Sequence, residues 1–407
     1  MGTLRALCAL RRQWMLLCAT LSSGLMMTGL VATDPARAAS QSVVLVDQDA
    51  AGVQSPGLEA LRADSTGFAR ASGPREFEFP RDHGPHSDFR YEWWYVTGNV
   101  DAADGRRFGF ELTFFRFALQ PPGASPASTS SEPRSSWRSS QFYMAHLAIT
   151  DVSSRAFHFA QRLERDALGL AGARAQPFRV WLDDWAIQQS GDATHWDLRA
   201  EDTRYALHLA LDLQSARPVL NGDAGLSRKS DESGGASYYY SMPRIAVAGQ
   251  LAFDAQSSDV RGLAWLDREW GSGSLGADEQ GWDWYALQLE EGSALMFYQL
   301  RRREGARDPH SAGTWVDASG HVRRLSDGDV RITTLAYWTS PRGDRYPSRW
   351  RLQVASIGMD VTVTPAVANQ ELGTTPRYWE GAVDVSGTRD ARPAKGRGYV
   401  ELVGYAK

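Results

Sequence analysis

The chain has 407 residues, of which 43% are hydrophobic and 23% charged, and its formal net charge is −4. This length accommodates two ordinary domains, and the balance excludes a disordered chain and a membrane protein with several spans. The acidic net charge argues against a nucleic-acid partner, because the one basic cluster, residues 301–303, is interpreted as a solvated strand end. Fifteen tryptophans indicate heavy aromatic cores or aromatic-lined cavities.

Residues 1–38 have the pattern of a secretory signal peptide. Three arginines precede an apolar stretch over residues 14–32, and small residues surround a cleavage site that we expect after Ala38. Both cysteines, Cys8 and Cys18, lie in this segment, so the mature chain would contain no disulfide and no thiolate metal site. We therefore expect a periplasmic or secreted protein that has no transmembrane domain once the signal peptide is removed.

An irregular leader is expected over residues 39–73, and strand patterns follow one another after it. Aromatic or β-branched residues alternate with polar ones, and short turns separate the runs. The expected strands include residues 108–115, 143–150, 178–188, 205–213, 245–253, 284–289, 295–300 and 350–354. Two segments, 121–140 and 222–237, break the rhythm and are interpreted as surface insertions without catalytic residues.

Several motifs recur in the same order along the chain. Residues 94–116 are echoed by 284–301, residues 196–211 by 350–363, and residues 245–265 by 383–401. Ordered echoes of this kind indicate two copies of one β unit. We place the first domain at residues 74–271, a Gly-rich linker at 272–280 and the second domain at 281–407, each with enough strands for a small barrel.

Residues 262–271 hold two carboxylates and two tryptophans in a strand-like run. Because side chains alternate along a strand, Trp265, Asp267 and Glu269 share one face. Burial among aromatic rings raises the pKa of a carboxyl group, so Asp267 is the first candidate for a general acid. In the alignment of the two repeats Asp267 matches Val403, which assigns the acid to one copy only.

Each candidate also has a structural alternative. Asp267 could instead form an ion pair with Arg244 or Arg268 at the junction between the two units. His146 is a second candidate for proton transfer, although a lone histidine on a strand is usually a hydrogen-bonded core residue. Glu92, which precedes two tryptophans, is a further buried acid whose structural role is the favoured interpretation.

No metal site and no cofactor is expected. Residues 82–88 contain two histidines and two aspartates, but the Gly-Pro turn between the histidines indicates a loop that opens the domain. Residues 271–274 contain a Gly-x-Gly-Ser run that no helix follows, so it is interpreted as linker rather than a phosphate-binding loop. The chain has no G-x-S-x-G motif to support a serine hydrolase.

Several motifs together resemble a known family. They are residues 92–98 (Glu-Trp-Trp-Tyr-Val-Thr-Gly), 144–146, 240–244, 266–271, 281–284 and 378–381. They resemble the tandem-lipocalin family of AttH-like secreted proteins and carotenoid 1,2-hydratases (hydroxyneurosporene synthases) over nearly all of the mature chain. The resemblance implies an all-β fold of two tandem lipocalin-like antiparallel β-barrels with few short helices.

The resemblance also implies site residues. In the family's hydratases an aspartate is thought to protonate an isolated carbon–carbon double bond before water adds, and Asp267 matches that position. The hydratases have His and Trp where this chain has Tyr238 and Tyr240, and Tyr where it has Trp265. The catalytic candidates are Asp267, Glu269 and His146. The ligand-binding candidates are Glu92, Trp93, Trp94, Tyr238, Tyr240, Arg244, Trp265, Trp270, Trp282 and Trp284.

Three hypotheses about function follow. The leading one is an exported lipocalin-like protein that binds a hydrophobic small molecule, such as a lipid, terpenoid or polyene. The first alternative is a hydro-lyase of the carotenoid 1,2-hydratase type, with Asp267 as the general acid. The second alternative is an accessory protein of a cell-envelope export system, with transport components as partners, or a secreted hydrolase.

Overall fold

Residues 65–124, 140–232, 234–253, 256–273, 276 and 278–406 are described in a computed structural model of the chain. The predicted signal peptide and most of the leader lie outside them, as do residues 125–139 of the first predicted insertion. The described residues form strands and three short 3₁₀ helices, η1 (Arg81–His83), η2 (Asp327–Asp329) and η3 (Ala355–Ile357). No helix in this part of the chain has both the length and the apolar character needed to cross a membrane.

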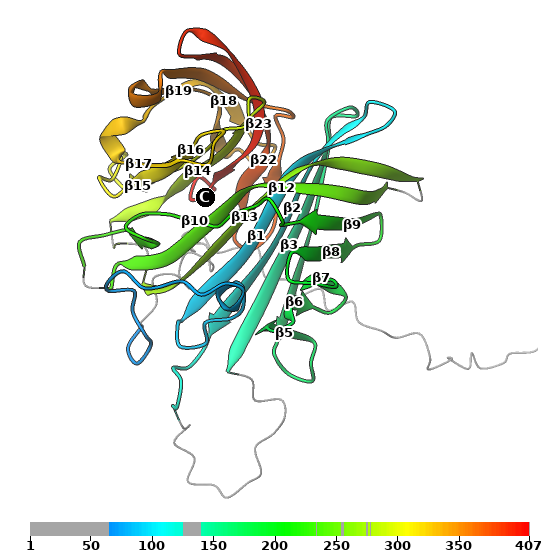
Figure 1. The fold of residues 1–407 in the computed structure, drawn as a ribbon, viewed down its shortest axis with the longest axis vertical. Helices are drawn as coiled ribbons and strands as arrows, with labels where there is room; N and C mark the ends of the chain where they lie inside the picture. Colours follow the sequence, from blue (N-terminus) through cyan, green and yellow to red (C-terminus); the bar gives the residue numbers. More distant parts are fainter. Residues whose placement is uncertain are drawn as a thin grey trace, which may run out of the picture. The chain divides into compact units, whose positions relative to one another are not determined.

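The first sheet has 13 antiparallel strands (Figure 1). Its hydrogen-bonded order is β4-β3-β2-β1-β13-β12-β9-β8-β7-β6-β5, and β10 and β11 both pair with β12. The strands are β1 (Tyr91–Ala102), β2 (Arg107–Ala118), β3 (Gln141–Asp151), β4 (Ala156–Arg165), β5 (Ala171–Ala175), β6 (Phe178–Leu182), β7 (Trp185–Gln189), β8 (His195–Glu201), β9 (Tyr205–Asp212), β10 (Val219–Leu220), β11 (Leu226–Arg228), β12 (Ala236–Phe253) and β13 (Gln256–Gly273).

The second sheet has 10 antiparallel strands in the order β17-β16-β15-β14-β23-β22-β20-β19-β18, and β21 pairs with β22. The strands are β14 (Glu279–Leu289), β15 (Ala294–Arg302), β16 (Ala312–Val316), β17 (Val322–Leu325), β18 (Arg331–Thr339), β19 (Arg345–Val354), β20 (Met359–Pro365), β21 (Glu371–Leu372), β22 (Tyr378–Arg389) and β23 (Arg392–Leu402).

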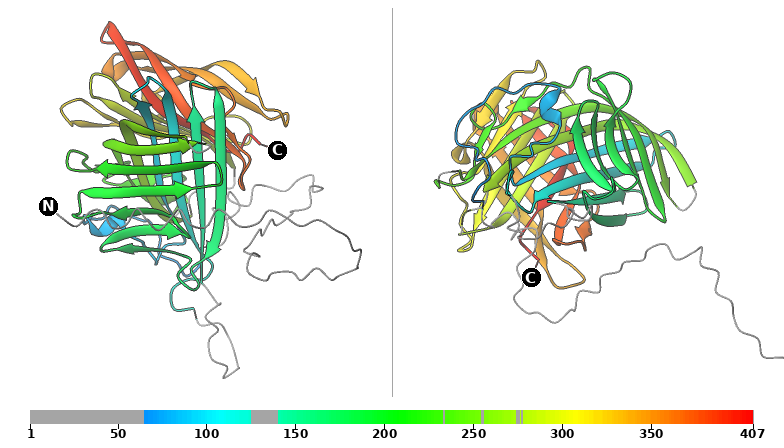
Figure 2. Two further views of the ribbon diagram at one scale, coloured as in Figure 1. Left: turned by 90° about the vertical axis from the view of Figure 1, so that its right-hand side faces the viewer. Right: turned by 90° about the horizontal axis from the view of Figure 1, so that it is seen from below.

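The strand order confirms the internal repeat. Strands β14 to β17 take the places of β1 to β4, and β23, β22, β20, β19 and β18 take those of β13, β12, β9, β8 and β7. Both sheets belong to one compact unit, Gly52–Lys407, and curl into a near-barrel and a half-barrel (Figure 2). The predicted all-β, lipocalin-like fold is therefore confirmed, and the two predicted barrels are a near-barrel and a half-barrel.

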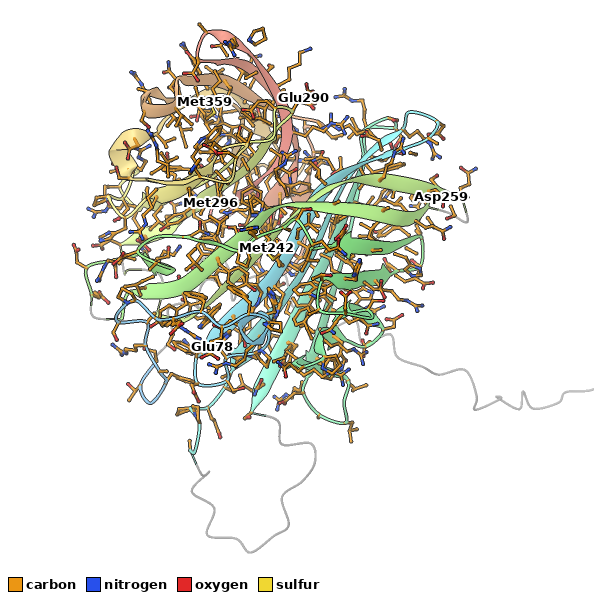
Figure 3. All side chains as sticks on the ribbon, in the orientation of Figure 1. Glu78, Met242, Asp259, Glu290, Met296 and Met359 are labelled. Carbon is orange, nitrogen blue, oxygen red and sulfur yellow. The ribbon has the colours of Figure 1, made fainter. Side chains whose placement is uncertain are left out.

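Burial differs between strands according to how many of their faces are covered. In β9 every second residue is buried, as expected of a strand with one face in water. In β1, in β14 and over residues 264–272 of β13, burial is almost continuous. Side chains fill the inside of each curled sheet (Figure 3), and a further cluster of aromatic residues joins the outer faces of the two sheets. The central strands are thus buried on both faces.

The two sheets approach each other closely where β2 meets β22. A Cβ atom added to Gly109 would lie 2.6 Å from the Cβ of Ala382, so only glycine fits at this position without a shift. This contact holds the backbones of the two sheets close together on one side of the layer between them.

Three local expectations differ from the structure. The segment 178–188 forms two strands, because Asp183 adopts the left-handed conformation with φ 54° and turns the chain between β6 and β7. The alignment of Trp94 with Trp284 is out of register, since Trp94 lies in the first core and Trp284 in the layer between the sheets. The segment 222–237 includes β11 and contributes a buried lysine, described below.

A buried ion cluster lies on the inner side of the first sheet. Glu92 is fully buried and accepts hydrogen bonds from Arg116 and, at 3.1 Å, from Arg268. Burial opposes ionisation of Glu92, but Arg116, a hydrogen bond from His86 and Arg268 hold the pKa of this carboxyl well below its usual range. Arg268 also donates to the carbonyl of Trp93 at 2.6 Å. Glu92 therefore lies in an ion cluster with two buried arginines, and the structural role favoured by its sequence context stays a prediction.

Replacing Glu92 with Gln should lower the free energy of unfolding by about 3–5 kcal/mol, because two buried guanidinium groups lose their counter-charge. Urea unfolding followed by tryptophan fluorescence measures this loss. Asp360→Asn is the matched control, since Asp360 pairs with Arg351 at the surface and water screens that pair. Equal losses in the two variants would contradict a stabilising role for the buried cluster.

Candidate functional site

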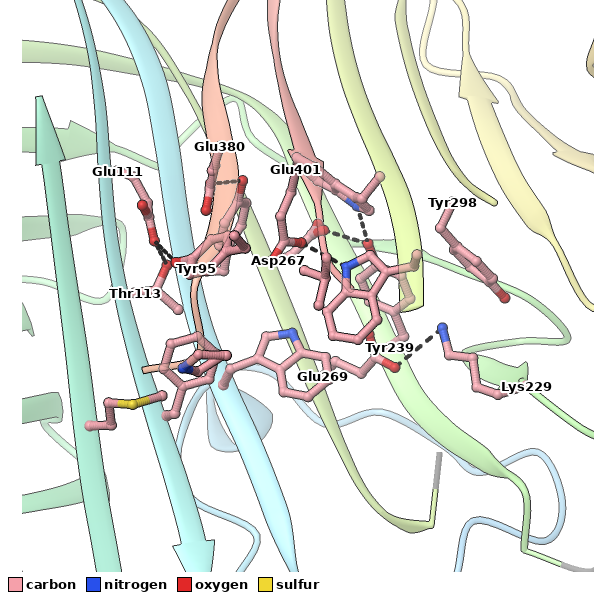
Figure 4. A pocket seen from close by; sticks show the side chains of 18 of the residues that line it. Tyr95, Glu111, Thr113, Lys229, Tyr239, Asp267, Glu269, Tyr298, Glu380 and Glu401 are labelled. Atoms are coloured by element: carbon pink, nitrogen blue, oxygen red, sulfur yellow. Dashed lines mark hydrogen bonds and ion pairs between the residues drawn. The ribbon is translucent and has the colours of Figure 1, made fainter. Parts of the chain in front are cut away.

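A cavity of about 120 Å³ lies in the layer between the two sheets (Figure 4). Strands from both repeats line it, so neither sheet alone forms its wall. Its aromatic lining consists of Trp93, Tyr95, Phe115, Phe117, Tyr239, Trp282, Trp284, Tyr298 and Tyr378. Its acidic lining consists of Glu111, Asp267, Glu269, Glu380 and Glu401, and Lys229 is a cation among them. The site is an aromatic cavity with an unusual number of buried carboxyl groups.

Strand alternation explains which side chains reach the cavity. On β13, Asp267 and Glu269 point outward into the layer between the sheets, while Arg268 and Trp270 point into the first core. The register places Asp267 opposite Tyr95 of β1 and Ser241 of β12. One strand therefore supplies a core residue and a cavity residue in turn.

Asp267 is held by three hydrogen-bond donors. Its Oδ1 accepts from Ser241 Oγ at 2.5 Å and from Trp265 Nε1 at 2.6 Å, and its Oδ2 accepts from the Tyr239 hydroxyl. Burial raises the pKa of Asp267 to about 7; the three donors lower it, and the charge of Glu269 raises it further. Asp267 can therefore hold or release a proton near neutral pH, in a fixed orientation.

Glu269 and Lys229 form an ion pair at the cavity wall. Lys229 Nζ lies 3.3 Å from Glu269 Oε1 and 3.7 Å from the centre of the Tyr298 ring. Burial disfavours the ammonium ion, but the neighbouring Glu269 carboxylate raises the pKa of Lys229 overall. Lys229 precedes β12 in the segment 222–237 and is buried in the cavity wall, so the interpretation of this segment as a surface insertion is wrong.

The second repeat contributes carboxyl groups of its own. Glu401 on β23 accepts a hydrogen bond from Trp282 Nε1 at 2.9 Å, and burial raises its pKa to about 8. Glu380 lies opposite Glu401 in the register of β22 and β23. The match of Asp267 with Val403 therefore does not confine acids to the first repeat, because Glu401 and Val403 both face the cavity.

Five of the predicted site residues line the cavity, namely Trp93, Asp267, Glu269, Trp282 and Trp284. Trp265 lies behind Asp267 as its hydrogen-bond donor. The predicted ligand-binding residues Trp94, Tyr238, Tyr240 and Trp270 instead pack in the first core. Arg244 donates to the carbonyl of Leu289 at 3.1 Å, and the alternative ion pair of Asp267 with Arg244 or Arg268 is not the arrangement found.

His146 does not line the cavity but contacts Tyr378, which does. Gln161 donates to its Nε2 at 2.8 Å, and the amide orientation is fixed by a second bond from Gln161 Nε2 to the carbonyl of Thr375. The ring proton is therefore on Nδ1, which contacts the Tyr378 hydroxyl at 2.7 Å. Burial lowers the pKa of His146 to about 3, so the ring is neutral and positions Tyr378.

Sequence reasoning missed Glu111, Glu380, Glu401, Lys229 and Tyr239. A signal existed for Glu111, an acid between aromatic and aliphatic residues of a strand, and for Glu380, which lies inside a family motif. No signal in the sequence indicated that the outer faces of two sheets enclose the cavity. Among the side chains that the structure describes, no group of three His, Cys, Asp or Glu residues is arranged to hold a metal ion.

The chain matches the family model described as AttH-like over residues 70–405. The structure of an AttH protein from Nitrosomonas europaea is 36% identical, has a TM-score of 0.72 and aligns with 83% of this chain and 100% of that chain. Kievitone hydratase from Nectria haematococca has a TM-score of 0.64 at 13% identity, over 85% of this chain and 98% of its own. Dehydratase asqC from Emericella nidulans is 22% identical over 215 residues, 46% of this chain and 56% of the dehydratase.

Raising the pH from about 4 to about 7 should destabilise the wild type more than Asp267→Asn. The unfolded carboxyl ionises near pH 4, whereas the folded one keeps its proton to about pH 7, so the folded state binds more protons in this window. The stability lost through Asp267 as pH rises amounts to at most about 4 kcal/mol. Urea unfolding across this pH range measures the difference.

Asp259→Asn is the control for that experiment, because Asp259 is an exposed aspartate on the same strand. It lies away from the layer between the sheets, which Met296 marks in Figure 3. A wild type and Asp267→Asn that lose stability in parallel would show that Asp267 does not keep its proton in the folded state.

Proposed function

Since the chain belongs to the AttH-like family, we propose that it is an exported protein that binds an apolar small molecule between its two sheets and acts on it as a hydro-lyase. The proposed reaction adds water to a carbon–carbon double bond or, in reverse, removes water from an alcohol. The predicted signal peptide supports a place for this reaction in the periplasm or outside the cell.

One observation carries the proposal: a fully buried carboxyl group lies at the wall of an aromatic cavity, with a pKa of about 7. Water addition to an unactivated double bond needs an acid that is not ionised, surroundings that exclude bulk water and a wall that tolerates positive charge. The Asp267 carboxyl supplies the acid that is not ionised. The faces of Tyr95, Tyr239 and Trp284 supply the wall that tolerates positive charge, because aromatic quadrupoles attract cations.

The proposed steps balance without a cofactor. The Asp267 carboxyl gives its proton to one alkene carbon, and the electron pair of the double bond forms the new C–H bond. A water molecule then bonds through oxygen to the resulting carbocation, and its surplus proton returns to the Asp267 carboxylate. Glu269 and Lys229 remain an ion pair and act on Asp267 through the field of Glu269.

The comparisons support a reaction of this class. One structural relative is named a hydratase and one relative by sequence a dehydratase, and these two activities are the two directions of one reaction type. The match to the dehydratase spans only 56% of that protein, so its substrate is not carried over.

Ligand binding without chemistry is the second candidate. The nine aromatic side chains in the cavity wall favour it, because such a lining binds apolar molecules whether or not a carboxyl group acts on them. In this case the buried acids would serve only to orient the ligand.

Isotope labelling separates the two candidates. Purified protein is incubated in water enriched in ¹⁸O with kievitone or with neurosporene, and mass spectrometry measures incorporation of one labelled water. We expect one of these probes to incorporate labelled water in the presence of the wild type. In Asp267→Asn the rate of incorporation should fall by about 100-fold or more, because the general acid is lost. Asp259→Asn, altered at the surface of the same strand, should retain the wild-type rate.

Equal labelling by the wild type and Asp267→Asn would contradict the role of Asp267. If both probes quench the tryptophan fluorescence of the wild type but neither incorporates labelled water, the ligand-binding candidate would be favoured.

A further inference from the structure

Two carboxyl groups from different sheets meet inside the cavity. Glu111 of β2 and Glu380 of β22 are both fully buried, and both line the cavity wall (Figure 4). Each lies two residues from the close contact between Gly109 and Ala382, which brings these strands together. The packing of the two sheets therefore fixes the two acids side by side.

The donors on other described residues leave one oxygen atom of each carboxyl available to the partner glutamate and to a ligand. Glu111 Oε1 accepts from Thr113 Oγ1 at 2.8 Å and from the Tyr378 hydroxyl at 3.3 Å. Glu380 Oε1 accepts from the Tyr95 hydroxyl at 2.5 Å. Among the residues described, no other residue donates a hydrogen bond to the Oε2 atom of either glutamate.

Among the described residues that act most strongly on the pair, no cation compensates its charge. The titratable groups that act on it from the neighbouring strands are Glu401 and the tyrosines Tyr95, Tyr378 and Tyr399, and this set of described neighbours includes no cation. Two adjacent carboxylates in a dry site repel each other strongly, so a proton held between them is the stable arrangement. Burial raises the pKa of Glu111 to about 7 and that of Glu380 well above its usual range.

We propose that Glu111 and Glu380 share one proton and form a binding site for a hydroxyl group of the ligand. In the empty pair the shared proton bonds one carboxyl to the other. A hydroxyl group that enters replaces this bond with two, because it accepts from the protonated carboxyl and donates to the ionised one. The inference rests on the proposed use of this cavity for a ligand, and it specifies the substrate class as an apolar molecule that carries a hydroxyl group apart from the reacting carbons.

The shared proton is tested first, without a ligand. Infrared spectroscopy at about pH 9, where Asp267 and Glu401 are ionised, should show a carboxylic-acid C=O band in the wild type. The band should be lost in Glu111→Met/Glu380→Met, a double variant that replaces the pair with apolar groups of similar size. A wild type without this band, or a double variant that keeps it, would overturn the shared proton.

The hydroxyl site is tested with three probes that share the naphthalene ring system. Isothermal titration at about pH 6 compares 2-naphthol, which donates and accepts, with 2-methoxynaphthalene, which only accepts, and 2-methylnaphthalene, which does neither. The wild type should bind 2-naphthol at least about tenfold more tightly than the other two, because an unpaired buried polar group is costly. Equal affinities, or no binding of any probe, would overturn the assignment even if the double variant fails to fold.

Variants separate this inference from the hydro-lyase proposal. Glu111→Met/Glu380→Met should lose the preference for 2-naphthol, whereas Asp267→Asn should keep it. If Asp267→Asn loses turnover and the wild type shows no preference, the hydroxyl site fails alone. If the preference is present but turnover does not depend on Asp267, the hydro-lyase proposal fails alone.

Discussion

The packing of two curled sheets through their outer faces is the constraint on which the site depends. A strand in a single curled sheet has one face in the core and one in water, but β1, β2 and β14, and parts of β13, β22 and β23, are buried on both faces. A carboxyl group on the outer face of such a strand loses its hydration. Its pKa then rises, unless a cation compensates for the lost water.

Neighbouring residues on the two faces of β13, Asp267 and Arg268, illustrate a carboxyl group without a cation and one with a cation. On the inner face Arg268 pairs with Glu92, whose pKa is low and whose charge is retained. On the outer face Asp267 receives only neutral donors, and its pKa rises to about 7. Desolvation alone does not distinguish these carboxyl groups, since both are fully buried. The presence of a guanidinium group decides which acid is structural and which can exchange a proton.

Much of this arrangement could be predicted from the sequence. The alternation in residues 262–271 correctly places Trp265, Asp267 and Glu269 on one face, because the period of a strand is two regardless of what covers it. The ordered echoes likewise indicated a repeat, which the strand order confirms. What the alternation could not provide was the identity of the covering layer. Trp94, Tyr238 and Tyr240 were therefore expected to bind the ligand, whereas they pack in the core of the first sheet.

Several residues missed in sequence analysis share one physical feature: part of their environment comes from the other repeat. Glu111 becomes unusual only because Glu380 approaches it from β22, and Lys229 only because the ring of Tyr298 on β15 covers it. Even Asp267, whose three donors all belong to the first sheet, depends on Trp284 of the second, which donates to the Tyr239 hydroxyl at 3.1 Å. A single repeat would leave each of these groups in water with an ordinary acidity. Fusion of two repeats is thus what converts surface acids into groups able to move a proton near neutral pH.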